Sequence, residues 1–265
     1  MTSNFKGRYV ALGSSMAAGP GIAPRVAGSP LRAARSARNY PHLIARVLEL
    51  DLVDVTYSGA TTANLLTEPQ NGALPQVEAL TGSESLVTIT IGGNDVGYVP
   101  ALMAATLPAV VRGLPVIGPS LRSLLDKGAR DQALDLVGAS LRAVGETVRA
   151  RAPQARVVFV DYLTLLPPEG EPAPPLSTAD ADLGRHIAAR LVESTGSAAE
   201  ATGCEIVRAS HASRDYHAWS AHPWTVGAGF PLLSLLRRQP APFHPNAAGM
   251  RAVADLVVDL VRPVV

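Results

Sequence analysis

Five short apolar runs recur along the chain, each rich in valine or isoleucine and with little alternation of apolar and polar residues. Such runs are typical of strands that are buried on both faces, as the strands of a parallel sheet are. The pattern therefore predicts about five strands, at residues 9–12, 52–57, 86–91, 156–161 and 205–209.

Longer segments with a helical spacing of apolar residues separate these runs. The expected helices cover residues 39–50, 74–80, 131–152 and 178–201, and a last one follows His244. In the third helix the apolar residues fall near one face: Leu134, Leu136, Val137, Leu141, Val144 and Val148. The alternation of strands and helices implies a parallel sheet with right-handed crossovers. We therefore expect an α/β fold and, with no internal repeat or linker, a single domain over residues 1–265.

The composition narrows the class of protein. With 265 residues, 47% of them hydrophobic, and a net charge of +1, the chain is long enough for a sizeable core and offers no electrostatic case for nucleic-acid binding. Its one cysteine, Cys204, excludes an internal disulfide and fits a reducing compartment. The apolar run before Gly13 is too short for a signal-peptide core, and prolines with Arg112 interrupt the apolar stretch 96–118. We therefore expect a cytoplasmic protein without integral membrane association.

The first apolar run leads into a candidate nucleophile. It ends in Gly13, Ser14 and Ser15, and small residues that permit a tight turn follow. A serine hydroxyl here would lie at the carboxyl end of a strand, the edge at which open α/β sheets bind their ligands. Gly-Ser-Ser is common in loops, so the segment is weak evidence by itself.

Three later segments offer partners for such a serine. Gly59 follows the second predicted strand, and Asn94 lies in a Gly-Gly-Asn-Asp segment at the end of the third. His244 begins the segment His-Pro-Asn-Ala-Ala-Gly, just before the last predicted helix. Each is commonly a turn or loop residue when considered alone. Because the carboxyl ends of parallel strands share one rim of the sheet, the combination indicates a common site.

These four segments resemble, in order, the motif blocks of the SGNH (GDSL-type) hydrolases and esterases. The resemblance implies a flavodoxin-like three-layer α/β/α sandwich with a central parallel sheet. It also implies Ser15 as nucleophile, His244 as base, and an oxyanion hole made by Ser15, Gly59 and Asn94. These roles agree with the chemistry, because a serine hydroxyl needs a base and the tetrahedral oxyanion needs donors aimed at it.

The chain departs from the family pattern at two positions. Ser14 stands where the family has the aspartate of Gly-Asp-Ser, and Ala241 stands where an aspartate commonly lies three residues before the histidine. Three alternatives remain for orienting His244: a backbone carbonyl of Ala241 or Pro242, as in some lipase-like members; the side chain of Asp215; or no orienting group. We favour the carbonyl, because the intervening chain is short and a carbonyl can still fix the tautomer.

The remaining histidines have weaker claims to a role. We expect His42 and His186 to be structural, and His217 and His222 to pack or lie at the surface rather than line the site. No cluster of residues has the spacing of a metal site, so we expect neither a metal nor a cofactor.

The sequence therefore predicts a serine esterase or lipase that hydrolyses carboxylic esters through an acyl-enzyme. Residues 96–118 and 230–236 are apolar and would line an acyl-chain groove, which favours lipid or medium-chain esters. Two alternatives stay open: an acyltransferase that uses the same site, and a non-catalytic lipid- or phosphate-binding relative. The sequence identifies no partner protein.

Overall fold

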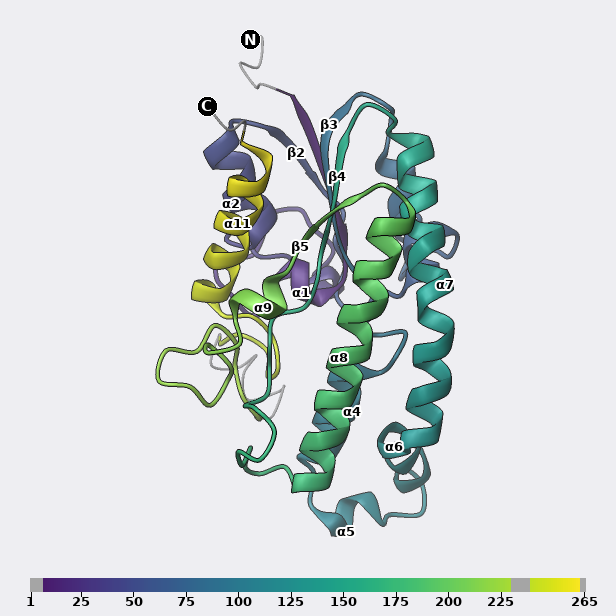
Figure 1. Ribbon diagram of the computed structural model, residues 1–265, viewed down its shortest axis with the longest axis vertical. Coiled ribbons are helices and arrows are strands. Elements are labelled where there is room, and N and C mark those ends of the chain that lie inside the picture. The colour runs from purple at the N-terminus through teal and green to yellow at the C-terminus, as the bar shows by residue number, and fades with distance from the viewer. Residues whose placement is uncertain (1–6, 230–238, 263–265) are drawn as a thin grey trace.

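The structure is a computed structural model that describes residues 7–229 and 239–262. Its centre is a five-stranded parallel sheet with the strand order β2-β1-β3-β4-β5 (Figure 1). The strands are β1 (Arg8–Gly13), β2 (Asp51–Asp54), β3 (Glu84–Thr90), β4 (Arg156–Val160) and β5 (Glu205–Val207). The prediction of five parallel strands is thus confirmed. Beyond β2 the backbone keeps pairing with β1, since the N–H of Tyr57 donates to the carbonyl of Gly13 at 2.9 Å.

Helices cover both faces of this sheet. The longer ones are α2 (Tyr40–Leu48), α4 (Tyr98–Ala105), α6 (Gly118–Leu125), α7 (Lys127–Arg151), α8 (Thr178–Ala201) and α11 (Ala247–Val261). The short ones are α1 (Ser15–Ala18), α3 (Thr62–Leu66), α5 (Ala109–Arg112) and α9 (Ala209–Ala212). No helix among the described residues is long and apolar enough to cross a bilayer.

Alternate residues of each strand point to opposite helix layers, which makes the molecule a three-layer α/β/α sandwich. Val10 and Leu12 belong to the core on the α7 and α8 side, whereas Tyr9 and Ala11 pack on the α2 and α11 side. Figure 1 shows these helix pairs on the two sides of the sheet. Because both faces are covered, the strand sequences read as continuous apolar runs.

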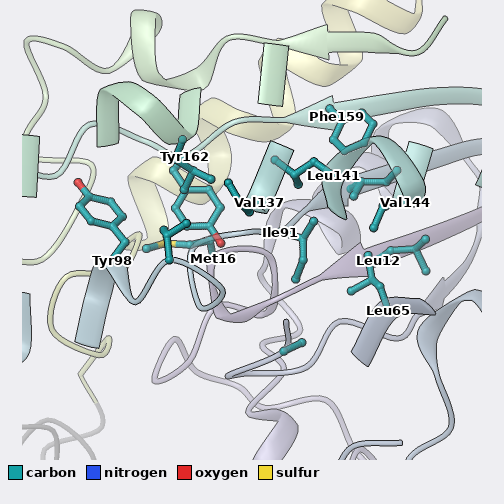
Figure 2. Packing of buried hydrophobic residues seen from close by; sticks show 14 of the residues in the cluster. Leu12, Met16, Leu65, Ile91, Tyr98, Val137, Leu141, Val144, Phe159 and Tyr162 are labelled. Atoms are coloured by element: carbon teal, nitrogen blue, oxygen red, sulfur yellow. The ribbon is translucent and has the colours of Figure 1, made fainter. Parts of the chain in front are cut away.

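The helix α7 follows its predicted pattern with two corrections. It begins at Lys127 rather than at residue 131, because the side chain of Asp126 accepts the N–H of Ala129 and caps its first turn. Leu136, predicted on the buried face, is 72% exposed, since it lies about 200° around the helix from Leu134. Figure 2 shows Val137, Leu141 and Val144 of the buried face among other core side chains.

The predicted helix at residues 74–80 is wrong. A single 3-10 turn, Gln76–Ala79, occupies this segment. Pro75 precedes the turn and Leu80 returns to an extended conformation, so too few residues remain for an α-helix.

The strand order itself marks a place for a site. The chain leaves β1 toward β2 on one side, and the later strands are added on the other side of β1, beginning with β3. In open α/β sheets of this order, the crevice between the carboxyl ends of β1 and β3 is where ligands bind. The residues that follow these two strands include Ser15 and Asn94.

Candidate active site

The turn after β1 depends on a close approach between two strands. A Cβ atom at Gly13 would lie 2.6 Å from the carbonyl oxygen of Thr90, so a larger residue would separate β1 from β3. The next N–H, of Ser14, donates to the same Thr90 carbonyl at 2.9 Å. Ser15 then opens α1 at the carboxyl end of β1, 9% exposed.

Gln76 holds the same turn from the other side, a role that the sequence patterns did not reveal. Its side-chain oxygen accepts the N–H of Gly13 at 2.7 Å, and its amide donates to the Gly13 carbonyl at 3.0 Å. Gln76 is 5% exposed. This buried amide fixes the peptide that precedes the two serines.

His244 hydrogen-bonds to Ser15. Its Nε2 lies 2.8 Å from Oγ of Ser15, and its Nδ1 lies 2.7 Å from the carbonyl oxygen of Pro242. Because a carbonyl only accepts, Nδ1 carries the proton, and Nε2 of the neutral ring presents its lone pair to the serine hydroxyl. The residues are thus arranged for transfer of the hydroxyl proton to Nε2.

A backbone reversal brings His244 to this position. Phe243 is fully buried and adopts a left-handed conformation with φ of 56°. Its N–H donates to the carbonyl of Val226, whose own N–H donates to the carbonyl of His244, both at 2.9 Å. A left-handed conformation costs a non-glycine residue on the order of 1–3 kcal/mol, and such strain concentrates at functional sites.

The surroundings of His244 favour the neutral ring. Burial lowers the pKa of His244 below its ordinary value, and the hydrogen bond to the Pro242 carbonyl opposes this shift only in part. Asp215 is exposed, and among the described residues only Ser15 and Pro242 hydrogen-bond to the ring. The carbonyl of Ala241 is not the ring's partner, although the Ala241 N–H holds this segment to the carbonyl of Pro20 at 3.0 Å.

Asn94 and Gly59 lie beside each other across two loops. The side-chain amide of Asn94 donates to the carbonyl of Ala60 at 2.8 Å, which leaves its second N–H available. Gly59 is exposed with φ of 81°, and no described residue accepts its N–H or that of Ser15. Three N–H donors at this rim of the sheet therefore have no acceptor among the described residues.

Comparison with known proteins gives a family match over most of the chain. The GDSL-like Lipase/Acylhydrolase family model matches residues 11–252. The chain belongs to this family. It is 34% identical to Lipase 2 of Streptomyces coelicolor over 257 residues, which are 95% of this chain and 85% of that protein. The family and this lipase relative identify the chain as a carboxylic ester hydrolase.

Two solved structures share the fold of this GDSL-family chain. Phospholipase A1 from Streptomyces albidoflavus NA297 superposes with a TM-score of 0.76 at 24% identity, over 97% of this chain and 99% of that one. An extracellular lipase from Streptomyces rimosus superposes with a TM-score of 0.77 at 24% identity, over 96% and 98%. At this level of identity the likeness concerns the fold alone.

The GDSL-family turn that contains Asn94 is tied to the Gly59 loop a second time. The carboxylate of Asp95 accepts the backbone N–H of Thr62 at 3.0 Å and its hydroxyl at 2.6 Å. Burial raises the pKa of Asp95, while the hydrogen bonds from Thr62 act in the opposite direction. Asp95 thus holds the start of α3 against the end of β3, a link between two loops that no local sequence pattern indicates.

Ser14, which replaces the aspartate of the GDSL motif, is buried. Its Oγ lies 3.1 Å from the hydroxyl of Tyr162, just beyond the end of β4. The turn that leads to Ser15 therefore has a neutral hydrogen bond where the motif has a charge.

The histidines outside the GDSL-family site have other partners or are exposed. His42 bonds to Asn39 at 2.8 Å and His186 to Asp131 at 2.6 Å. Among the described histidines, only His244 bonds to Ser15. The others considered from the sequence do not: His42, His186, His217 and His222. Within residues 7–229 and 239–262, no group of His, Cys, Asp and Glu could hold a metal ion.

The first of the two segments expected to form an acyl groove lies partly in the core and partly at the surface. In the stretch 96–118, α4 packs five of its residues into the core, whereas Val110 and Val116 are 75% and 88% exposed. The segment 230–236 lies outside the described residues.

Proposed function

We propose that the chain hydrolyses lipid or medium-chain acyl esters through an acyl-enzyme on Ser15, with His244 as general base. The observation that carries the proposal is the hydrogen-bonded series from Pro242 O through the His244 ring to Oγ of Ser15, at 2.7 and 2.8 Å. A serine hydroxyl is a weak nucleophile, and a neutral imidazole that accepts its proton makes attack possible at neutral pH.

The first half of the reaction acylates the serine. Oγ of Ser15 attacks the ester carbonyl carbon while its proton passes to Nε2 of His244, forming a tetrahedral oxyanion. Collapse of this intermediate breaks the bond to the alcohol, which leaves with the proton from Nε2. In the second half, water attacks the acyl-enzyme by the same route, and the free acid and Ser15 are released.

The backbone N–H groups of Ser15 and Gly59 and the side chain of Asn94 stabilise the oxyanion. The Asn94 amide is already held by the Ala60 carbonyl, so little reorganisation is needed when the negative charge develops. Loss of one such donor typically costs about 100- to 1,000-fold in rate.

An apolar cavity of about 380 Å³ supports a preference for acyl chains. It lies next to the site, because Tyr162, which contacts Ser14, forms part of its wall. Most of the wall is apolar; it includes Tyr98, Leu165, Leu166, Ala188, Leu191 and Val192. Burial of each methylene group contributes about 0.8 kcal/mol, which favours longer chains up to the length of the cavity.

Covalent labelling tests the proposal. A fluorophosphonate probe should label the wild-type chain at Ser15, as located by peptide mass spectrometry, and Ser15→Ala should abolish labelling. His244→Ala should slow it strongly, because the base is lost. A folded wild-type protein that resists the probe would favour the non-catalytic lipid- or phosphate-binding alternative.

Product analysis separates the hydrolase from the acyltransferase that the same site would serve. Octanoyl ester turned over in the presence of glycerol or another alcohol should yield mainly free octanoate. A new ester as the main product would assign the chain to acyl transfer.

Cytoplasmic location also stays a proposal, since the Streptomyces rimosus lipase is an extracellular protein.

A further inference from the structure

The hydroxyl of Tyr162 lies between the two turns that carry oxyanion donors. Its oxygen accepts the backbone N–H of Gly93 at 3.0 Å and lies 3.1 Å from Oγ of Ser14. Gly93 directly precedes Asn94, and Ser14 directly precedes Ser15. One phenol group, two residues beyond the end of β4, thus connects the turn after β1 with the turn after β3.

The ring of Tyr162 fits closely against the second turn. A Cβ atom at Gly93 would lie 2.3 Å from Cε2 of the ring and 2.7 Å from its hydroxyl oxygen, so this contact requires glycine. Tyr162 is 7% exposed, and burial raises its pKa to about 12. The group is therefore a neutral phenol near neutral pH, able to donate and to accept a hydrogen bond.

We propose that Tyr162 is a positioning residue of the ester hydrolysis, which sets the spacing between the donors on the Ser15 turn and the Asn94 side chain. The inference rests on the proposed function of Ser15 and Asn94 and extends it to a residue whose hydroxyl bonds to the neighbours of these two residues and not to them. Tyr162 reaches Ser14 at the position where the GDSL motif has an aspartate, so the uncharged side chain of Ser14 still ties this turn to the oxyanion site.

The spacing matters because oxyanion donors act at about 2.7–3.1 Å from the developing charge. A displacement of about 1 Å in such a site can cost about 100-fold in rate, even when the altered residue lies outside the reacting groups. Substrate binding in the ground state depends on these donors much less. Loss of the link should therefore lower kcat and leave KM nearly unchanged.

The first variant is Tyr162→Phe, which retains the ring and its packing and removes the bridging oxygen. With a short soluble p-nitrophenyl ester, kcat should fall about 10- to 100-fold while KM changes less than about threefold. Binding of a trifluoromethyl ketone, which forms a tetrahedral adduct with the serine, should weaken by a similar factor. The acid limb of the pH profile should not move, because the contacts of His244 are intact.

Tyr9→Phe is the matched control. Tyr9 is fully buried, and its hydroxyl lies 2.7 Å from Oγ1 of Thr88. This contact joins β1 to β3 on the α2 and α11 side of the sheet. Removal of this hydroxyl should leave kcat within about twofold of wild type, since it connects no turns.

Ser14→Ala provides a second variant in case the Tyr162→Phe protein folds poorly, and it completes a double-mutant cycle. Ser14→Ala removes only the contact between Tyr162 and the nucleophile turn, and should also lower kcat. If the link acts as one unit, the double variant should be little slower than the slower single variant. Additive losses, or a Tyr162→Phe enzyme with wild-type kcat, would overturn the positioning role. Failure of the fluorophosphonate to label Ser15 in the wild-type protein would instead refute the proposed function.

Discussion

The carbonyl oxygen of Pro242 lies 2.7 Å from Nδ1 of His244, on the side of the ring where a triad places its carboxylate. A carbonyl fixes the tautomer and the ring orientation as a carboxylate does, but it carries no charge to stabilise the imidazolium that forms during attack. This difference determines how the site should respond to pH and to the removal of nearby acids.

Asp215→Ala should leave kcat/KM within about twofold of wild type, because Asp215 is exposed and has no bond to the His244 ring. His244→Ala should lower kcat by about 1,000-fold or more, since the base is lost. Steady-state kinetics on both variants make the comparison. Equal losses in the two would assign the orienting role to Asp215.

The acid limb of kcat/KM should have its inflection below pH 6.5, the ordinary pKa of histidine. Burial lowers the pKa of His244, so the neutral, active form persists to lower pH. The same sign applies to folding: the contribution of His244 to stability is complete above its unfolded pKa and declines as pH falls through the lower folded value. A pH–rate profile with an acid inflection above 6.5 would contradict this environment.

Asn94→Ala should reduce kcat about 100- to 1,000-fold with a smaller effect on KM, because we propose that its amide donates to the transition-state oxyanion. The variant also loses the bond to Ala60, so its thermal midpoint must be measured alongside the kinetics. An Asn94→Ala enzyme with near wild-type kcat would remove Asn94 from the oxyanion hole.

Asp95→Ala should destabilise the fold by about 1–3 kcal/mol, because the buried N–H and hydroxyl of Thr62 lose a charged acceptor. Urea unfolding gives the change in free energy. Asp135→Ala is a suitable control, since Asp135 is exposed and pairs only with Arg190 at the surface. A loss of the same size in both variants would show that Asp95 has no special structural role.

Ala188→Trp should shift the preference from octanoyl toward acetyl esters, because the indole would fill part of the 380 Å³ cavity that Ala188 lines. Ala189→Trp is the matched control, since this neighbour on α8 is exposed. The ratio of kcat/KM values for the two esters provides the measurement. An unchanged ratio in Ala188→Trp would place the acyl chain elsewhere.

Residues close together in the sequence account for most of what could be predicted. Continuous apolar runs indicate burial on both faces and located the five strands. The helical spacing of apolar residues located the long helices α7 and α8. The positions of Ser15 and Asn94 at strand ends followed from the same runs. Leu136 was misplaced for a different reason: helical geometry alone puts it about 200° around the helix from Leu134, on the exposed face.

The sequence by itself determined the parallel strands, the motif blocks and the pairing of a serine with a histidine. Only the tertiary structure decided that the Pro242 carbonyl is the hydrogen-bond partner of His244 Nδ1, since that contact depends on the left-handed Phe243 and on pairing with Val226. It also decided that Tyr162 meets Ser14, 148 residues away in the chain. The physical reason is that hydrogen bonds between loops depend on strand order and loop paths, which local periodicity does not encode.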